Sequence, residues 1–265
     1  MRITLFCLCL SCCVSCTKNI HLDLSLSGKE YVIQGVITDS AGECRVAIST
    51  DQDFYDTTIH TGISGALITI TDDNGVITTL PETTNGVYTA PSLTGRPGAT
   101  YHLSVQMAGA SYTASSTMPQ PVDLDSLYLS SESVFGDKKK VVHAVFRDPP
   151  GKNNNYRFVE YVQGYQQSAV FISNDEITDG TLVDNELLNF STSDNNNTDN
   201  RKILSGDSVS VVMQCIAPAV YTFWYSLSQS ASGQAAPANP VSNISGGAFG
   251  YFSAQTQRQT SLIAP

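Results

Sequence analysis

The sequence predicts a mainly β protein, in which an N-terminal antiparallel sandwich of immunoglobulin or transthyretin type is followed by a second antiparallel β domain carrying one short helix. Three observations support this fold class. Short runs rich in β-branched and aromatic residues alternate apolar and polar positions, as half-buried strands do. Turn-forming residues separate these runs. One stretch near the C-terminal end has instead the apolar spacing of a helix.

Seven such runs fall within residues 30–120, which predicts a complete sandwich. They are YVIQGVIT, CRVAIST, ALITITD, VITTL, VYT, TYHLSVQM and SYTASSTM. Asp73-Asn74-Gly75 separates the third run from the fourth and predicts a tight hairpin, because Asn-Gly tolerates positive φ angles. Met118-Pro119-Gln120-Pro121 then interrupts the pattern, since proline lacks the N–H that a central strand donates. We place a domain boundary there and assign residues 121–265 to the second domain.

The second domain contains six further runs of β character, separated by the loops at 148–151 and 195–200. They are SLYL, VVHAVF, YRFVEYV, SAVFIS, DSVSVVMQC and GAFGYFSA. Between the last two, Pro218 and Gly233 are suited to the first turn and the end of a helix. Four apolar residues between them have i, i+3, i+4, i+7 spacing: Val220, Phe223, Trp224 and Leu227. This predicts a helix over about 218–231, although the same aromatic residues are also compatible with a strand.

The N-terminus has the pattern of a targeting segment. Arg2 supplies a positive charge, and the uncharged run from Ile3 to Val14 is too short to span a bilayer. Five of the seven cysteines fall in or just after this run, which does not fit a disulfide framework spread along a domain. We therefore expect residues 1–15 to be a signal peptide.

Val14-Ser15-Cys16 resembles a bacterial lipobox, in which the cysteine sulfur receives diacylglycerol. Cys16 would then be the lipid-anchored first residue of the mature chain, with residues 16–29 as its tether. Cys13 occupies the position where leucine is usual, and two alternatives stay open: Cys12 as the anchor, or a plain secretory signal. Two or three acyl chains give stable anchoring, whereas one chain binds only marginally.

Composition excludes some partners. The net charge is −10, and removal of residues 1–15 deletes one base and no acid. An acidic surface of this size argues against binding of nucleic acid. The only basic run, Lys138-Lys139-Lys140, fits a solvated strand edge. Cys44 and Cys215 are the cysteines of the folded part, and their apolar strand neighbours predict two buried free thiols in different domains.

The order and spacing of several short motifs resemble a Bacteroidota outer-membrane lipoprotein family filed as a domain of unknown function. Besides the lipobox, they are residues 31–38, Gly65-Ala66-x-Ile68-x-Ile70-x-Asp72 with Asn74-Gly75, Gly86-x-Tyr88, Met118-Pro119, Leu124-Asp125-Ser126-Leu127, Phe146-x-Asp148-Pro149 with Asn155-Tyr156, Asp175-Glu176 with Asp179-Gly180, Gly206-Asp207-x-Val209-x-Val211, Tyr221-x-x-Trp224, Asn239-Pro240-x-x-Asn243-Ile244-x-Gly246-Gly247, and Gly250-Tyr251-Phe252.

The resemblance implies an accessory role, because such lipoproteins are commonly encoded beside TonB-dependent receptors, the barrels that import ligands. It implies no catalytic residues, and no cofactor other than the covalent lipid on Cys16. It also implies the outer membrane as location. The cell surface and the periplasmic face both stay open, because Lys18 fits a surface-export signal whereas Asn19 does not.

A search for chemistry yields one near miss. The four histidines are far apart in sequence, and we find no motif that pairs a nucleophile with a base. Asp175, Asp179 and Glu186 have three of the positions of an EF-hand loop, but Ile177 stands where an oxygen ligand is required. We therefore expect a polar β-turn there, no metal and no enzyme.

Aromatic residues are the candidates for binding, since tyrosine combines a large contact area with a polar group. Trp224 lies on the apolar helix face and is expected in the core, whereas Tyr55, Tyr165 and Tyr225 are freer to contact a ligand. The leading hypothesis is a non-enzymatic lipoprotein that helps a TonB-dependent receptor capture a nutrient. The alternatives are a structural or adhesive surface protein and, third, a hydrolase with an unrecognised site.

Overall fold

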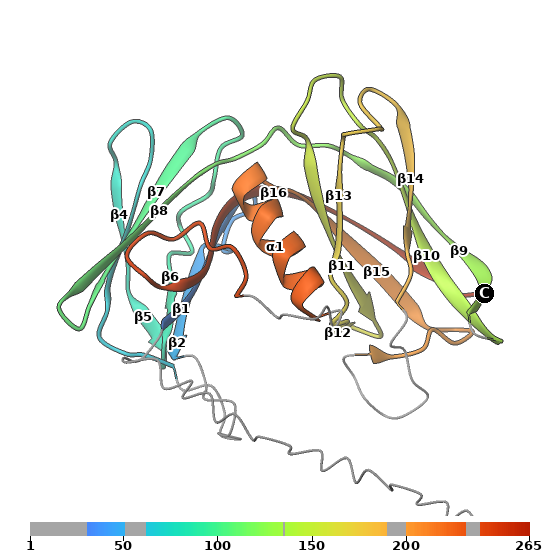
Figure 1. The fold of residues 1–265 in the computed structure, drawn as a ribbon, viewed down its shortest axis with the longest axis horizontal. Coiled ribbons are helices and arrows are strands. Elements are labelled where there is room, and N and C mark those ends of the chain that lie inside the picture. Colours follow the sequence, from blue (N-terminus) through green and yellow to red (C-terminus); the bar gives the residue numbers. More distant parts are fainter. Residues whose placement is uncertain (1–30, 51–61, 135, 190–199, 232–238) are drawn as a thin grey trace, which may run out of the picture.

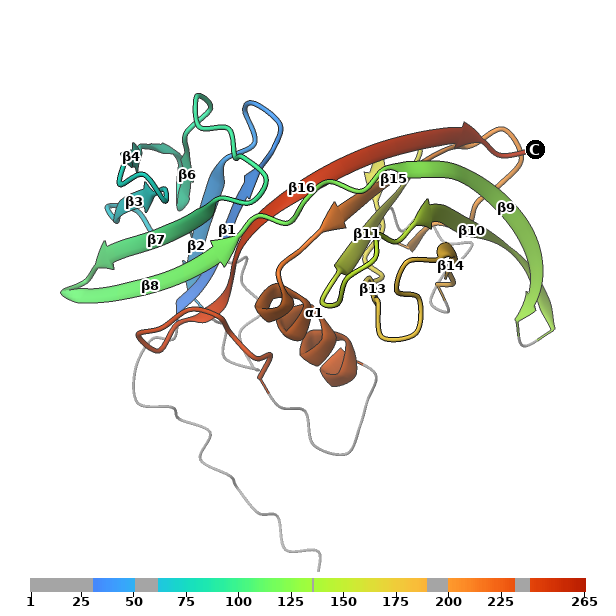
Figure 2. The same cartoon turned by 90° about the horizontal axis from the view of Figure 1, so that it is seen from above.

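The computed structural model describes residues 31–50, 62–134, 136–189, 200–231 and 239–265. In this part of the chain, two β-sandwiches stand side by side and share one long strand, β16 (Phe249–Ile263) (Figures 1 and 2). The protein is thus mainly β with one helix in its described part, as predicted. The expected signal peptide and tether, with Cys16, and the candidate Tyr55 lie outside the described residues.

The first sandwich packs a four-stranded sheet, in the order β4-β3-β7-β8, against strands β1, β2, β5 and β6. The strands are β1 (Tyr31–Thr38), β2 (Arg45–Thr50), β3 (Leu67–Thr71), β4 (Ile77–Leu80), β5 (Glu82–Thr84), β6 (Val87–Thr89), β7 (Thr100–Met107) and β8 (Ala110–Thr117). The predicted hairpin joins β3 to β4: Gly75 has a φ of 79°, and Asp72 accepts hydrogen bonds from the N–H groups of Asn74 and Val76. The alternation on β7 buries every second residue, as the pattern predicted.

The second sandwich packs a three-stranded sheet, in the order β14-β10-β9, against strands β11, β12, β13 and β15. The strands are β9 (Leu124–Val134), β10 (Asp137–Arg147), β11 (Asn155–Val162), β12 (Tyr165–Gln166), β13 (Phe171–Asn174), β14 (Leu182–Leu187) and β15 (Ser208–Cys215). The sequence did not predict β14, because its acidic and amide side chains interrupt the apolar alternation.

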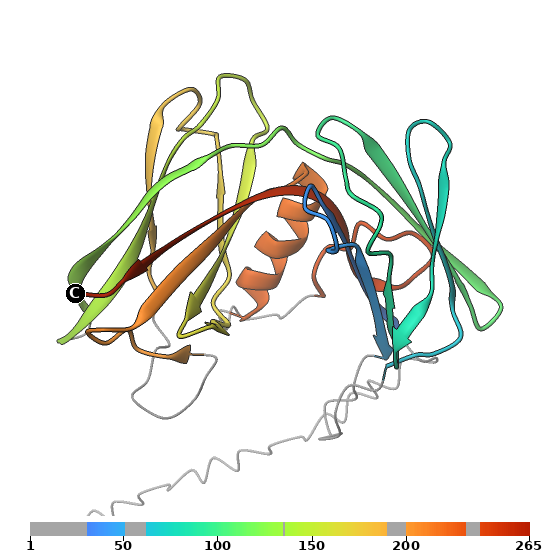
Figure 3. The ribbon, with the colours of Figure 1, turned by 180° about the vertical axis from the view of Figure 1, so that it is seen from behind.

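Strand β16 joins the two sandwiches. Its first half pairs parallel with β1, from Phe249 to Gln255, and its second half pairs antiparallel with β15, from Thr256 to Ile263. Figure 3 shows this strand in red, crossing from one sandwich to the other. The predicted last strand stopped at Ala254, since the polar residues that follow lack an apolar alternation. One sheet of nine strands therefore runs through both sandwiches.

The parallel pairing of β16 with β1 changes the composition of the first core. Ile244, Ala248, Phe252 and Ala254 belong to the same hydrophobic cluster as Ile33. All of residues 121–265 were expected in the second domain, whereas residues 244–254 contribute to the core of the first sandwich. A linear boundary could not anticipate that the end of the chain returns to the first sandwich.

Helix α1 (Pro218–Ala231) lies on the outer face of the nine-stranded sheet, where it contacts β11, β13 and β16 (Figure 2). It buries Val220 and Phe223, two of the four residues whose spacing predicted it. The predicted helix is therefore confirmed, and Gly233 lies outside the described residues. In the described ranges, no helix combines the length and the apolar character that crossing a bilayer requires.

Both cysteines of the folded part are buried and free, as predicted. Cys44 lies in the first core and Cys215 in the second, and the two do not form a disulfide. Burial raises the pKa of Cys44 to about 11 and also raises the pKa of Cys215. Neither thiol is therefore suited to act as a thiolate nucleophile near neutral pH.

Candidate functional site

A partly buried cation lies beneath α1. Arg157 on β11 places its Cζ 3.8 Å from the centroid of the Trp224 ring, and its Nη1 donates to Gln214 Oε1 at 2.9 Å. Its Nε is buried and has no hydrogen-bond partner among the described residues. Burial lowers the pKa of Arg157. The ring face thus compensates part of the desolvation of the guanidinium, which ties the helix to the sheet.

The aromatic residues of α1 divide between its two faces. Trp224 packs on Tyr251 of β16, with ring centroids 5.1 Å apart, so it faces the sheet. It is only partly buried and belongs to neither hydrophobic core, which differs from the core position expected from the sequence. Tyr225 is 49% exposed and stacks on Tyr221, with centroids 6.1 Å apart. The structure therefore separates an anchored tryptophan from a tyrosine pair that reaches solvent.

Tyr165, the third tyrosine singled out from the sequence, lies on β12 at the hairpin end of β11. It is 49% exposed, and the guanidinium of Arg201 lies 5.6 Å from its ring centroid. Tyr165 and Tyr225 are both about half exposed, and a ligand contact at either residue stays a prediction. No contact brings them together, so they are two separate surface positions on the second sandwich.

The segment with the incomplete calcium-loop pattern, which contains Asp175 and Asp179, forms a polar turn before β14. Asp175 accepts a hydrogen bond from the N–H of Asn154, and Asp179 accepts one from the N–H of Gly151. Glu186 lies on β14, outside this turn. Among the described residues, no three His, Cys, Asp or Glu side chains are close enough to hold a metal ion. The carboxylates of the turn instead fix the 148–155 loop.

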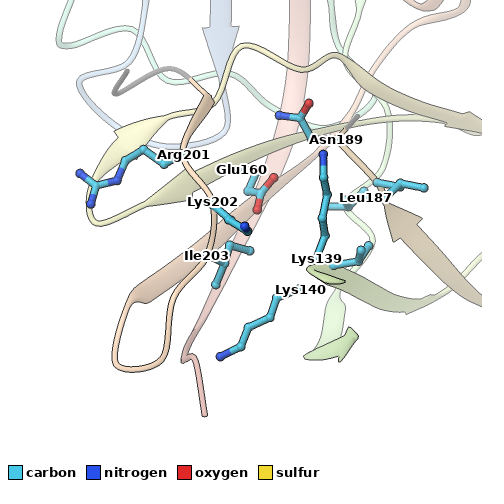
Figure 4. A pocket seen from close by; sticks show the side chains of 10 residues that line it. Lys139, Lys140, Glu160, Leu187, Asn189, Arg201, Lys202 and Ile203 are labelled. Atoms are coloured by element: carbon cyan, nitrogen blue, oxygen red, sulfur yellow. The ribbon is translucent and has the colours of Figure 1, made fainter. Parts of the chain in front are cut away.

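A small cavity of about 10 Å³ lies among residues of β10, β11, the end of β14 and the segment 201–203 (Figure 4). It has room for about one water molecule. Glu160, which is 5% exposed, lines it together with four basic residues: Lys139, Lys140, Arg201 and Lys202. Burial raises the pKa of Glu160 to about 7. This carboxyl group therefore changes its ionisation near neutral pH, in a space too small for an organic ligand.

The outer face of the three-stranded sheet carries a hydrogen-bonded cluster of four side chains. His143 Nδ1 lies 3.0 Å from Asp184 Oδ1, and His143 Nε2 lies 3.1 Å from Ser130 Oγ. Tyr128 stacks on His143 with ring centroids 4.4 Å apart, and its hydroxyl donates to Asp184 Oδ2. The bonds from Tyr128 and His143 lower the pKa of Asp184.

The sequence search missed this cluster, because Ser130 and Asp184 are 13 and 41 residues from His143. Part of it could have been found from the pairing of β9 with β10, which places His143 opposite Tyr128. Asp184 could not, because β14 was not predicted. Three adjacent strands bring together a serine, a histidine and an aspartate that no local motif places near one another.

Comparisons with known proteins give a family but no activity. A family model described as a domain of unknown function, DUF4249, matches residues 17–261. A search of curated proteins gives no match. Among solved structures, a segment of two fibronectin type-III domains from chicken tenascin has 10% sequence identity, and the match covers 89% of this chain and 98% of that chain, with a TM-score of 0.24. Because the family model spans nearly the whole sequence, this chain belongs to the DUF4249 family.

Proposed function

We propose that this protein is a lipid-anchored lipoprotein of the outer membrane that assists a TonB-dependent receptor in capturing or retaining a nutrient. Its contribution to uptake is binding and needs no chemistry of its own. The lipobox at Cys16 and the motifs shared with the lipoprotein family support this proposal. The observation that carries it is the stacked pair of Tyr221 and Tyr225 on α1, in which Tyr221 is partly buried and Tyr225 is 49% exposed.

Tyr221 and Tyr225 have the properties of interface anchors. Their rings stack on a helix whose neighbouring face is held by the contact between Trp224 and Arg157. A rigid aromatic side chain loses little conformational entropy on binding, and residues that dominate interface energies are often tyrosines. We therefore assign the outer side of α1 as the surface that contacts the receptor.

The experiment is affinity purification of the full-length protein from detergent-solubilised membranes of its native host. We expect the wild type to recover a barrel protein, and the double variant Tyr221→Ala/Tyr225→Ala to recover at least tenfold less. Ile77→Ala is the matched control, because Ile77 is 65% exposed on β4 in the first sandwich. Equal recovery by the double variant and the wild type would contradict the assignment of α1.

The anchor is tested separately by incorporation of radiolabelled palmitate. We expect labelling of the wild type and of Cys12→Ala, and none of Cys16→Ala. If labelling is lost in Cys12→Ala and kept in Cys16→Ala, the lipid anchor is Cys12 and not Cys16. A protein that is unlabelled and freely released from cells would rule out the lipoprotein.

The structural or adhesive role remains the second candidate, because a rigid pair of sandwiches also suits a spacer. The two roles predict different phenotypes for a deletion strain. An accessory protein gives slower growth when its nutrient is the only carbon source, with normal attachment. An adhesive protein gives loss of attachment with normal growth on every nutrient.

A further inference from the structure

Ser130, His143 and Asp184 stand in the relative positions of a nucleophile, a general base and the group that orients the base. Each ring nitrogen of His143 has one partner: Nε2 faces the Ser130 hydroxyl at 3.1 Å, and Nδ1 faces the Asp184 carboxylate at 3.0 Å. A carboxylate at Nδ1 favours the tautomer with its proton there, which leaves Nε2 free to accept the serine proton.

The three side chains come from three adjacent strands, which fixes their geometry. Val142 and Ala144, the neighbours of His143 on β10, are fully buried in the second core, so His143 points to the outer face. Its ring is held from one side by Tyr128, which also donates to Asp184. The base is thus oriented by a stacked ring as well as by a carboxylate.

We propose that Ser130 is an activated nucleophile and that this face of the sheet hydrolyses aryl esters of short acids. This inference goes beyond the proposed accessory role and does not depend on it, because α1 and the cluster involve different strands and different faces. Ser130 and His143 are the catalytic residues of the proposal, whereas Asp184 and Tyr128 are positioning residues.

The reaction balances in two steps. Ser130 Oγ bonds to the ester carbonyl carbon while its proton moves to His143 Nε2, and the bond from that carbon to the aryl oxygen then breaks as the leaving group takes the proton. Water next attacks the acyl-serine, with His143 again accepting and returning a proton. The products are a carboxylic acid and a phenol, and Ser130 is regenerated.

The openness of this face sets the class of substrate. The cavity beside Glu160 does not include Ser130, His143 or Asp184, so it cannot hold a long acyl chain next to them. We therefore expect the acyl group to be short. Tyr128 is 42% exposed and offers its ring to an aromatic leaving group. Water solvates the developing oxyanion at an open face, and one preformed oxyanion donor is worth about 10²–10³-fold in rate. We therefore expect slow turnover of esters with good leaving groups and no cleavage of amides.

The test uses the full chain with a fluorophosphonate probe, in which the Ser130 oxygen displaces fluoride from phosphorus and its proton goes to His143. We expect one adduct per protein, mapped to Ser130 by peptide mass, and slow release of 4-nitrophenol from 4-nitrophenyl acetate. Ser130→Ala should abolish both signals. Ser126→Ala is the matched control, since Ser126 lies on the same strand and face and is exposed. An adduct that persists in Ser130→Ala overturns the proposal.

The role of His143 as base is separated from a structural role by chemical rescue. His143→Ala should label at least about 10²-fold more slowly than the wild type, and added imidazole should restore part of the rate. Labelling of His143→Ala at the wild-type rate overturns the proposal, as does a folded variant that imidazole does not rescue.

The positioning residues give a graded result. Asp184→Asn should slow labelling by about tenfold or more, because the amide no longer holds the required tautomer of His143. Asp184→Glu should recover part of that loss, and Tyr128→Phe, which keeps the stacked ring, should lose less than Asp184→Asn. If Asp184→Asn lowers the melting temperature but labels as fast as the wild type, the cluster is structural and the proposal fails.

Discussion

The two sandwiches share a sheet but differ in what they bury. The buried polar residues of strands β1 to β8 are Thr38 and Ser116, both neutral. Among the described residues, the second sandwich buries four acids: Asp148, Glu160, Asp175 and Asp207. Because buried charge costs free energy unless it is paired, the stability of the second sandwich depends on specific hydrogen bonds and on pH. The buried acids of this comparison all lie in the second sandwich.

The largest expected effect comes from breaking the strand that both sandwiches share. Gly250 has a φ of 108°, and a Cβ there would lie 2.0 Å from the carbonyl oxygen of Ile33. Gly250→Ala should cost about 4 kcal/mol in the free energy of unfolding. Gly247→Ala is the control, because its φ is 89° but its Cβ would meet no atom within 4 Å, so it should cost about 1–2 kcal/mol.

This pair of variants also tests whether the sandwiches unfold together. The single tryptophan, Trp224, contacts both Arg157 of the second sandwich and Tyr251, the neighbour of Gly250 on the half of β16 that pairs with β1. Urea unfolding followed by tryptophan fluorescence should therefore shift as far as unfolding followed by circular dichroism. A circular dichroism transition that splits into two steps, with only one of them shifted by Gly250→Ala, would show that the two halves unfold independently.

The next effect compares buried acceptors of the two sandwiches. Asp148 is fully buried and accepts hydrogen bonds from the Tyr156 hydroxyl and the N–H of Gly180. Asp148→Ala leaves both donors without a partner and should cost about 3 kcal/mol. Ser116→Ala, which removes a neutral acceptor of the Ala254 N–H in the first sandwich, should cost about 1 kcal/mol. Thermal unfolding at pH 7 measures both, and equal costs would contradict the comparison.

Acidic groups in the two sandwiches should give opposite pH dependence. Burial raises the pKa of Glu160 from 4.5 to about 7, so the folded state retains a proton that the unfolded state has lost. Ionisation of Glu160 should therefore lower the free energy of unfolding by up to about 3 kcal/mol as pH rises from 4.5 to 7. Glu160→Gln should remove this pH dependence.

Glu82 of the first sandwich supplies the contrast. The hydrogen bond from Ser64, followed by the N–H of Gly86, lowers its pKa. Its contribution is present above the unfolded pKa and is lost as pH falls through the folded value. Glu82→Gln should therefore reduce stability at pH 7 but not at low pH, as measured by urea unfolding across a pH series. The same sign for both variants would be inconsistent with these shifts.

The smallest effect separates neighbouring residues of α1. Trp224→Ala removes the ring that covers Arg157 and should cost about 2 kcal/mol. Tyr225→Ala should change stability by less than about 0.5 kcal/mol, because its side chain is half exposed, although it is expected to weaken receptor binding. Chemical unfolding followed by circular dichroism compares them. A Tyr225→Ala cost equal to that of Trp224→Ala would make the tyrosine pair structural.

Features encoded within a short segment were predictable. The hairpin at Asn74-Gly75 followed from the φ angles that this dipeptide tolerates, and the helix from Pro218 followed from the spacing of Val220 and Phe223. Strand β14 was missed because its polar side chains do not alternate with apolar ones. Asp175 and Asp179 have an incomplete calcium-loop pattern in the sequence. In the folded loop, their carboxylates instead accept hydrogen bonds from the N–H groups of Asn154 and Gly151, which are distant in sequence.

The sequence by itself determined most of the strands, the one helix of the described part, and which side of most of them faces a core, because side-chain periodicity and turn chemistry act over a few residues. Only the tertiary structure decided that β16 returns to β1, that Glu160 faces a cavity of basic residues, and that Ser130, His143 and Asp184 meet. Each of these depends on the pairing of segments far apart in the chain, and no local pattern specifies that register.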